Sequence, residues 1–238
     1  MKFAAILKQS LTDYPGQIAA VLFTRGCNLR CPFCHNPHLL IKPGRSETVT
    51  QLPDEDVIDF LHERRGFLDA VVISGGEPSL HSDLPLFLRK VKDLDYLIKL
   101  DTNGSNPVML NEILREGLLD YVAMDIKAPL EYKSYQGACG KLGSEDFFNI
   151  RSSVQLLLQA SIMVEFRTTV VPCLHQPEDI EAIARYIEGA RLYTLQQFNP
   201  ECTLEPGYGK VVPYSREEIQ AVAEKCSKYV QKVKVLQV

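Results

Sequence analysis

The sequence predicts an α/β protein built on a largely parallel sheet. From residue 19 onward, short β-rich apolar runs alternate with segments whose apolar residues recur at helical spacing. Most of the runs are nearly continuously apolar, which is typical of parallel strands covered by helices. Six of them are expected to be strands: Ala19–Thr24, Ala70–Ser74, Leu97–Asp101, Tyr121–Ile126, Met163–Val171 and Leu192–Phe198.

A helical segment is expected after each of these strands. Ser82 is a suitable N-cap for one of them, and Pro107 occupies a first-turn position where proline is tolerated. Six strand–helix units joined by right-handed crossovers can form either an open doubly wound sheet or an incomplete (β/α)6 barrel. The expected helices are Asp54–Arg65, Ser82–Lys92, Pro107–Glu116, Phe147–Gln159, Pro177–Glu188 and Ser215–Val230.

The chain is interpreted as one domain over residues 1–238. Residues 1–18, with a turn at Tyr14-Pro15-Gly16, resemble an added strand or hairpin. The loop over residues 25–51 is unusually long, and long loops in compact domains are usually functional or disordered. We therefore expect this loop to contribute to the site.

Composition and charge exclude several classes of protein. The net charge is −4 and Lys and Arg are not clustered, so neither a nucleic-acid partner nor an anionic membrane surface is expected. No targeting signal is visible, and no apolar run approaches the roughly 20 residues of a spanning helix. We expect a cytoplasmic protein. Of its seven cysteines, three lie within eight residues, a pattern that favours metal binding over disulfides.

The strongest chemical signal is the spacing Cys27-x3-Cys31-x2-Cys34. Thiolates are the usual ligands of iron–sulfur clusters, and three of them on a four-iron cube leave one iron open to a substrate or cofactor. A structural zinc site, with His35 or His38 as fourth ligand, is the alternative. The other four cysteines are scattered and are expected to be buried or incidental thiols: Cys139, Cys173, Cys202 and Cys226.

Unusual polar residues follow the expected strands at their carboxyl ends. The second strand leads into Gly75-Gly76-Glu77, the third ends in Asp101-Thr102-Asn103-Gly104, and the fourth ends in Asp125-Ile126-Lys127. In barrels and open α/β sheets alike, sites assemble at the carboxyl ends of parallel strands. These segments therefore predict one shared pocket.

The segment Cys27–Asn36 resembles the cluster loop of radical S-adenosylmethionine (SAM) enzymes, including an aromatic residue, Phe33, before the last cysteine. The resemblance implies an incomplete (β/α)6 TIM-like barrel and a 4Fe–4S cluster on Cys27, Cys31 and Cys34. It also implies that the open iron chelates SAM and that an electron from the cluster cleaves it. Gly75-Gly76-Glu77 resembles the second signature of these enzymes, in which glycines allow close backbone approach and the acid contacts the methionine amine.

Further segments resemble the activases of glycyl radical enzymes: Ser10–Gly16, Cys34–Pro37, Asp101–Gly104 and Asp125–Lys127. This likeness implies that Asp101, Thr102 and Asp125 lie near the SAM carboxylate, with a monovalent cation as a further candidate cofactor. It implies that Lys127 also lies near SAM. Asn199 stands where such activases place a sixth-strand contact to SAM, often a histidine.

Within that group the sequence is most similar to the activating proteins of anaerobic ribonucleoside-triphosphate reductase. The resemblance implies abstraction of a hydrogen atom from a glycine of that partner, with a flavodoxin or ferredoxin as electron donor. The alternatives are an activase of pyruvate formate-lyase or of another glycyl radical enzyme, and a radical SAM enzyme acting on a small molecule. A zinc-stabilised binding module is the non-enzyme alternative.

Overall fold

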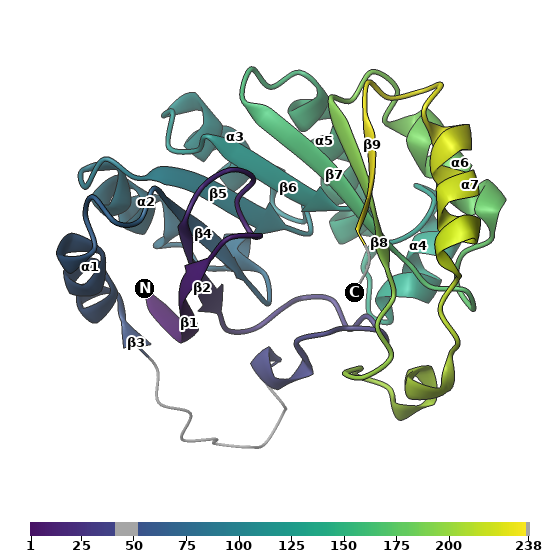
Figure 1. The fold of residues 1–238 in the computed structure, drawn as a ribbon, viewed down its shortest axis with the longest axis horizontal. Helices are drawn as coiled ribbons and strands as arrows, with labels where there is room; N and C mark the ends of the chain where they lie inside the picture. Colours follow the sequence, from purple (N-terminus) through teal and green to yellow (C-terminus); the bar gives the residue numbers. More distant parts are fainter. Residues whose placement is uncertain (41–51, 237–238) are drawn as a thin grey trace.

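In the computed structural model, which describes residues 1–40 and 52–236, nine strands form one curved sheet with helices along its outer side (Figure 1). Across the sheet, β2 and the strands from β4 to β9 are parallel to one another. In contrast, β1 is antiparallel to β2, and β3 is antiparallel to β1. The loop predicted over residues 25–51 is described as far as residue 40, and the rest of it lies outside the described residues. In spatial order the strands are β3 (Leu52–Pro53), β1 (Lys2–Ser10), β2 (Ala19–Thr24), β4 (Ala70–Gly75), β5 (Leu97–Thr102), β6 (Tyr121–Asp125), β7 (Met163–Val170), β8 (Leu192–Gln197) and β9 (Val233–Leu236).

Each of the six predicted helices is present, with ends that differ from the prediction by a few residues. None of the helices in the described part of the chain is both long and apolar enough to span a membrane. One further helix, α4, was not predicted, because Gly137 within it and Gly140 after it weaken the helical pattern. The helices are α1 (Asp54–Glu63), α2 (Leu84–Lys92), α3 (Pro107–Arg115), α4 (Tyr132–Cys139), α5 (Ser144–Leu158), α6 (Pro177–Tyr186) and α7 (Arg216–Cys226).

The order of the strands decides between the two predicted architectures. From β2 through β4, β5, β6, β7 and β8 to β9 the spatial order follows the chain order, without the reversal that defines a doubly wound sheet. The two edge strands, β3 and β9, do not pair with each other within the described residues, so the sheet curves without closing. The incomplete (β/α)6 TIM-like barrel is confirmed.

Both faces of the central parallel strands are buried, which accounts for their continuous apolar sequences. Leu22 and Ile73 point outward into the large core beneath the helices. Their neighbours Val21 and Val72 point inward, into a smaller core inside the barrel. Because successive side chains of a strand point to opposite faces, a strand buried on both sides shows no polar alternation.

The turn after β1 closes the amino end of the barrel. Tyr14 is buried in the inner core, and its ring meets the edge of the Tyr121 ring with 5.6 Å between centroids. The Lys99 ammonium donates a hydrogen bond to the carbonyl of Asp13 and lies 5.4 Å from the centre of the Tyr121 ring. Residues 1–18 thus contain β1 and a turn that fills the floor of the barrel.

Two glycines bring the loop after β4 against the loop after β2. Gly75 has a φ of 123°, and a Cβ atom there would lie 2.3 Å from the backbone nitrogen of Thr24. A Cβ atom on Gly76 would lie 1.9 Å from the carbonyl oxygen of Gly26. The backbone N–H of Glu77 donates to that same carbonyl at 2.8 Å. The glycines therefore allow close backbone approach to the chain that leads into Cys27.

We expect the Gly76→Ala substitution to lower the free energy of unfolding by about 2 kcal/mol or more, because the added methyl group collides with backbone that cannot move freely. Urea denaturation measures this change. The matched control is Gly137→Ala, since Gly137 lies in α4 with nothing within 4 Å of the added atom. That control should raise stability by roughly 0.5–1 kcal/mol. Equal stability of the Gly76→Ala variant and the native protein would contradict the prediction.

Candidate functional site

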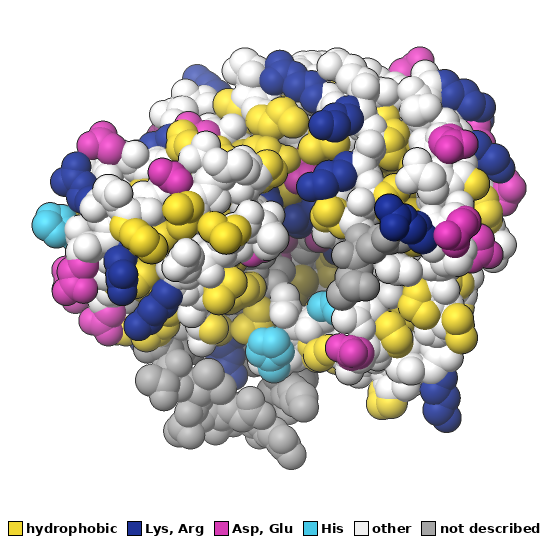
Figure 2. All heavy atoms as spheres, viewed as in Figure 1, with side chains coloured by type: hydrophobic (Ala, Val, Ile, Leu, Met, Phe, Trp, Pro, Cys, Tyr) yellow, Lys and Arg dark blue, Asp and Glu magenta, His cyan; other side chains and the backbone are white. Residues whose placement is uncertain are grey.

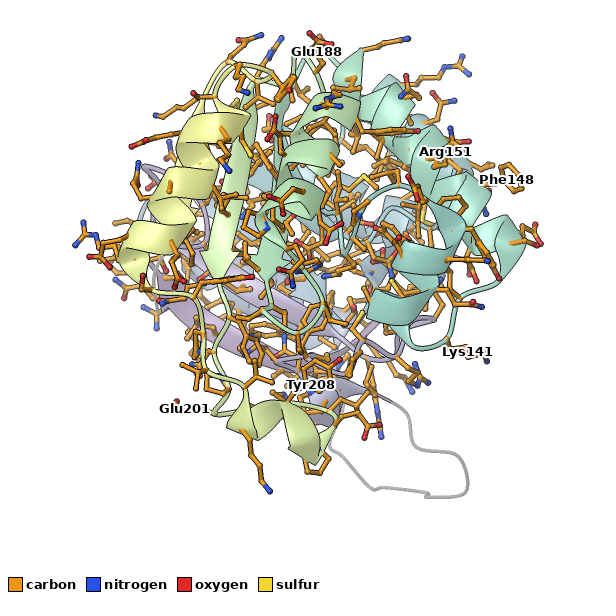
Figure 3. The ribbon with its side chains drawn as sticks, turned by 90° about the vertical axis from the view of Figure 1, so that its right-hand side faces the viewer. Lys141, Phe148, Arg151, Glu188, Glu201 and Tyr208 are labelled. Atoms are coloured by element: carbon orange, nitrogen blue, oxygen red, sulfur yellow. The ribbon has the colours of Figure 1, made fainter. Side chains whose placement is uncertain are left out.

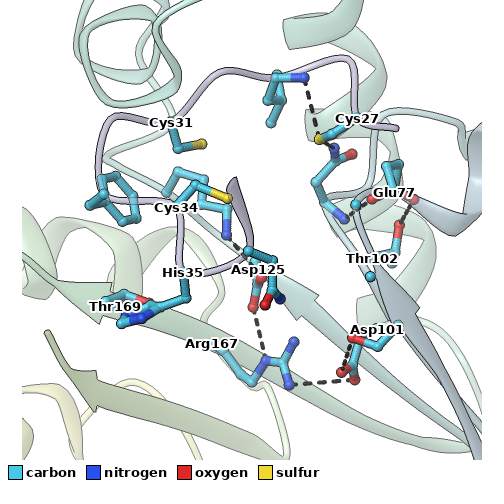
Figure 4. A pocket seen from close by; sticks show the side chains of 18 of the residues that line it. Cys27, Cys31, Cys34, His35, Glu77, Asp101, Thr102, Asp125, Arg167 and Thr169 are labelled. Atoms are coloured by element: carbon cyan, nitrogen blue, oxygen red, sulfur yellow. Dashed lines mark hydrogen bonds and ion pairs between the residues drawn. The ribbon is translucent and has the colours of Figure 1, made fainter. Parts of the chain in front are cut away.

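A cavity of about 250 Å³ lies between the loop after β2 and the carboxyl ends of the parallel strands (Figure 4). It brings together segments as far apart in the sequence as Cys27 and Gln196. On the face shown in Figure 2, the surface is hollowed near its middle, and charged side chains of both signs are visible inside the hollow. The predicted site residues that line the cavity are Cys27, Cys31, Cys34, Gly75, Gly76, Glu77, Asp101, Thr102, Asp125 and Lys127.

The cysteine-bearing loop is held in place by backbone hydrogen bonds, one within the loop and one to a distant helix. The N–H of Gly26 donates to the carbonyl of Leu39 at 2.9 Å, within the loop itself. The N–H of Arg30 donates to the carbonyl of Cys139 in α4 at 2.9 Å. Within the loop, the side chains of Leu29 and Phe33 are buried. The loop is therefore part of the packed structure, with its thiols on the cavity side.

The three thiols border the cavity at separate points (Figure 4). Among the described residues, no three His, Cys, Asp or Glu side chains converge on a point that one metal ion could occupy. A four-iron cube presents a different iron to each thiolate, so three cysteines of one loop that line a single cavity are suitable ligands for it.

Burial influences the protonation of these thiols. It raises the pKa of Cys27 to about 12, with the Glu77 carboxylate adding to the effect, and it also raises the pKa of Cys34. The pKa of Cys31 is lowered, chiefly by a side-chain hydrogen bond with Cys139. Metal ligation requires thiolates, so binding a positively charged cluster would release protons here.

The Glu77 carboxylate accepts hydrogen bonds from other groups of the protein. It is buried, and it accepts hydrogen bonds from the backbone and hydroxyl of Ser79 at 3.1 and 2.6 Å. It also accepts from the Thr102 hydroxyl at 2.7 Å and from the Asn103 N–H at 2.6 Å. Three of these donors bond to Oε1 and one to Oε2, so Oε2 keeps capacity to accept a further hydrogen bond. Glu77 lines the cavity, and its contact with the methionine amine stays a prediction.

Asp125 forms the centre of a buried ion network on the cavity floor. Its carboxylate is 2.8 Å from Lys127 Nζ and 2.8 Å from Arg167 Nε. Burial alone would raise the pKa of Asp125, but the charges of Arg167 and Lys127 hold it well below its usual range. Burial alone would lower the pKa values of Lys127 and Arg167, but the acids that face them keep both pKa values above their usual range. All three side chains are therefore charged.

Arg167 also joins Asp125 to Asp101. Arg167 Nη1 lies 3.4 Å from Asp101 Oδ1, and Lys99 Nζ lies 3.3 Å from the same oxygen. The other Asp101 oxygen accepts from the Ser74 hydroxyl at 3.0 Å. The two acids predicted to lie near the SAM carboxylate are thus paired with cations of the protein itself (Figure 4). A monovalent cation at this place stays a prediction.

Arg167 is the main site residue that the sequence analysis missed. A signal was present, because an arginine in the middle of a buried strand, β7, is unusual unless it is paired. Asn103 was noted only as part of a motif, yet it too lines the cavity.

Asn199 is not brought together with the other predicted residues. It lies just beyond β8, outside the cavity lining, and its side-chain oxygen accepts from the N–H of Glu201 at 2.9 Å. Gln196, within β8, lines the cavity from this part of the chain. The segment after β8, which contains Glu201 and Tyr208 in Figure 3, contacts the cysteine loop through a hydrogen bond from Glu205 N–H to the Pro32 carbonyl at 2.9 Å. A SAM contact from Asn199 stays a prediction.

The four scattered cysteines occupy different surroundings. Cys173 and Cys202 are exposed. Cys226 is buried under α6, where its thiol donates to the Ile180 carbonyl at 3.7 Å. Cys139 is fully buried and lies against Cys31, so it is not incidental to the site.

Comparisons with known proteins show the family of this chain. Residues 21–187 match the family model of the radical SAM superfamily. A protein of Methanocaldococcus jannaschii, provisionally named as a glycyl-radical enzyme activating enzyme, is 35% identical over 232 residues, which cover 97% of this chain and 93% of that one. The pyruvate formate-lyase-activating enzyme of Clostridium pasteurianum is 29% identical over 238 residues, covering 96% of this chain and 94% of that enzyme.

Solved structures show the same fold at low sequence identity. Streptococcus suis SuiB bound to S-adenosylmethionine superposes with a TM-score of 0.67 at 15% identity, over 92% of this chain and 51% of the SuiB chain. Escherichia coli QueE superposes with a TM-score of 0.56 at 16% identity, over 100% of this chain and 93% of QueE. Together with the cysteine-lined cavity at the strand ends, these matches show that the chain belongs to the radical SAM superfamily, among its glycyl-radical-enzyme activating enzymes.

Proposed function

We propose that this enzyme generates a glycyl radical on anaerobic ribonucleoside-triphosphate reductase. The observation that supports the proposal most directly is a single cavity with three cysteine thiols on one side and the Asp101–Asp125–Arg167 network on the other. In this proposal Cys27, Cys31 and Cys34 hold a 4Fe–4S cluster. A reduced cluster of this kind supplies the electron that cleaves SAM and so provides the radical that removes a hydrogen atom from glycine.

The charged floor of the cavity suits the methionine end of SAM, which carries a carboxylate and an amine. Lys127 and Arg167 present positive charge and Asp101 and Asp125 present negative charge, all on the cavity lining. Their mutual pairing holds these side chains in place before any ligand arrives, which limits the entropy lost on binding. We therefore assign Asp101, Thr102, Asp125 and Lys127 to SAM binding, and we add Arg167.

The choice of partner rests on sequence motifs, above all on Asp13-Tyr14-Pro15-Gly16. A barrel that does not close leaves a wider mouth than an eight-stranded one, and a glycine on a protein loop needs such an opening to reach the radical source. Activation of pyruvate formate-lyase is the second candidate, which the similarity to the Clostridium pasteurianum enzyme supports. A flavodoxin or ferredoxin is proposed as the electron donor in either case.

We expect protein reconstituted anaerobically with iron and sulfide to contain about four iron and four sulfide per chain. The Cys31→Ala variant should lose SAM cleavage, because one iron of the cube loses its ligand. Cys226→Ala is the matched control, since Cys226 is a buried cysteine outside the cavity. Iron and sulfide analysis, followed by chromatographic detection of 5′-deoxyadenosine, measures both properties. Undiminished cleavage by Cys31→Ala would exclude this assignment of the cluster.

Asp125→Asn should weaken SAM binding about tenfold or more while leaving the iron content unchanged. The substitution removes the charge that orients Lys127 and Arg167, so the cations on the cavity floor lose their fixed positions. Isothermal titration of SAM into cluster-loaded protein measures the affinity. Asp59→Asn, an exposed position on α1, is the control and should bind SAM as the native protein does. Equal affinities for both variants would place the SAM pocket elsewhere.

The partner is tested by electron paramagnetic resonance on the reduced enzyme mixed with SAM and an anaerobic ribonucleotide reductase. We expect a glycyl-radical doublet that disappears when the target glycine of the reductase is replaced by alanine. A doublet that forms only with pyruvate formate-lyase would move the function to the second candidate. If neither partner gives a radical although SAM is cleaved, the enzyme acts on a different substrate.

A further inference from the structure

Two of the three cysteines proposed as cluster ligands receive hydrogen bonds from side chains to which the proposed function gives no role. Cys27 Sγ accepts from the Leu29 N–H at 3.4 Å and from the Asn103 side-chain amide at 3.8 Å. Cys139 lies beside Cys31, because the Arg30 N–H donates to the Cys139 carbonyl at 2.9 Å, and its thiol hydrogen-bonds to the Cys31 side chain. The Leu29 donor belongs to the loop itself, whereas Asn103 directly follows β5 and Cys139 is the last residue of α4. Asn103 and Cys139 are therefore brought to the cysteine loop by the tertiary structure.

The Asn103 amide is held in one orientation. Its backbone N–H donates to Glu77 at 2.6 Å, and its side-chain oxygen accepts from the Ser105 N–H at 2.9 Å. With the oxygen occupied, the amide nitrogen faces the cysteine loop, where it also donates to Asn28 Oδ1 at 3.0 Å. Asn28 in turn donates to Asp146 at 3.1 Å. This chain of hydrogen bonds directs an N–H of buried Asn103 at the Cys27 sulfur.

Cys139, at the end of α4, is also held in one position. It is completely buried, and its carbonyl accepts from the Arg30 N–H at 2.9 Å. Gly140, which follows it, has a φ of 67° and packs so closely that a Cβ atom there would lie 2.4 Å from the Arg30 carbonyl oxygen. Backbone contacts on both residues therefore keep the Cys139 thiol against Cys31.

Hydrogen bonds to the sulfur ligands of an iron–sulfur cluster affect its reduction potential. Reduction adds negative charge to the cluster and its thiolates, and a donor aimed at a thiolate stabilises that charge. The proposed function places the cluster on Cys27, Cys31 and Cys34. On that basis, we propose that Asn103 and Cys139 are positioning residues that raise the cluster's reduction potential. They act through Cys27 and Cys31 and bind neither iron nor SAM.

The experiment is a redox titration of cluster-loaded protein without SAM, followed by electron paramagnetic resonance of the reduced cluster. Asn103→Ala and Cys139→Ala should each lower the equilibrium constant for one-electron reduction about tenfold, a fall of about 59 mV in midpoint potential. The double variant should show the sum, because the two donors act on different ligands. Asn103→Ala keeps the backbone N–H that Glu77 accepts from.

Two controls separate this role from a structural one. Cys226→Ala removes another fully buried thiol and should leave the potential unchanged. Cys139→Ser keeps a donor beside Cys31 and should restore most of the native potential. Iron content should equal the native value in all of these variants.

Unchanged potentials in Asn103→Ala and Cys139→Ala, with the cluster loaded, would overturn this inference and leave the proposed function standing. A loss of iron in both Cys139→Ala and Cys139→Ser would also overturn it, because Cys139 would then be a cluster ligand. Failure of the native protein to load any cluster would instead overturn the proposed function.

Discussion

The contact between the loops that follow β2 and β4 is the constraint on which the site depends. These strands are parallel neighbours, with Thr24 opposite Gly75, so both loops begin at the same edge of the sheet. Gly76 then lies against the Gly26 carbonyl at a distance that no side chain would allow. This contact determines where the chain enters the cysteine loop, and therefore where the three thiols stand relative to the other strand ends.

Charge pairing imposes a second constraint, on the cavity floor. Asp101, Asp125 and Arg167 come from three adjacent strands, β5, β6 and β7, and each is largely buried. A buried charge without a partner is costly, so the acids and the arginine require one another. Their pairing holds both acids beside the cavity.

The glycine and acid signature also organises the protein around the site. The glycines allow two loops to approach each other, and the Glu77 carboxylate organises the ends of β4 and β5 by accepting four hydrogen bonds. One of those bonds positions Asn103, which reaches Cys27. The signature is thus linked to the cysteine loop through the protein itself, and α4 supports the same loop from its other side through Cys139 and Gly140.

The sequence by itself determined six of the parallel strands, six of the seven helices in the described residues, the cysteine spacing and the polar residues at the strand ends, because these follow from local periodicity and from spacing along the chain. Periodicity alone left open whether the sheet is a barrel, which only the resemblance to radical SAM enzymes implied. The sequence could not assign Arg167, Asn103 or Cys139 to the site. Those outcomes depend on which strands become neighbours and on where each side chain points. Asn103 meets Cys27, and Cys139 meets Cys31, only after segments about 75 and 110 residues apart have packed together. Only the tertiary structure decides such contacts, because no local pattern in the sequence encodes them.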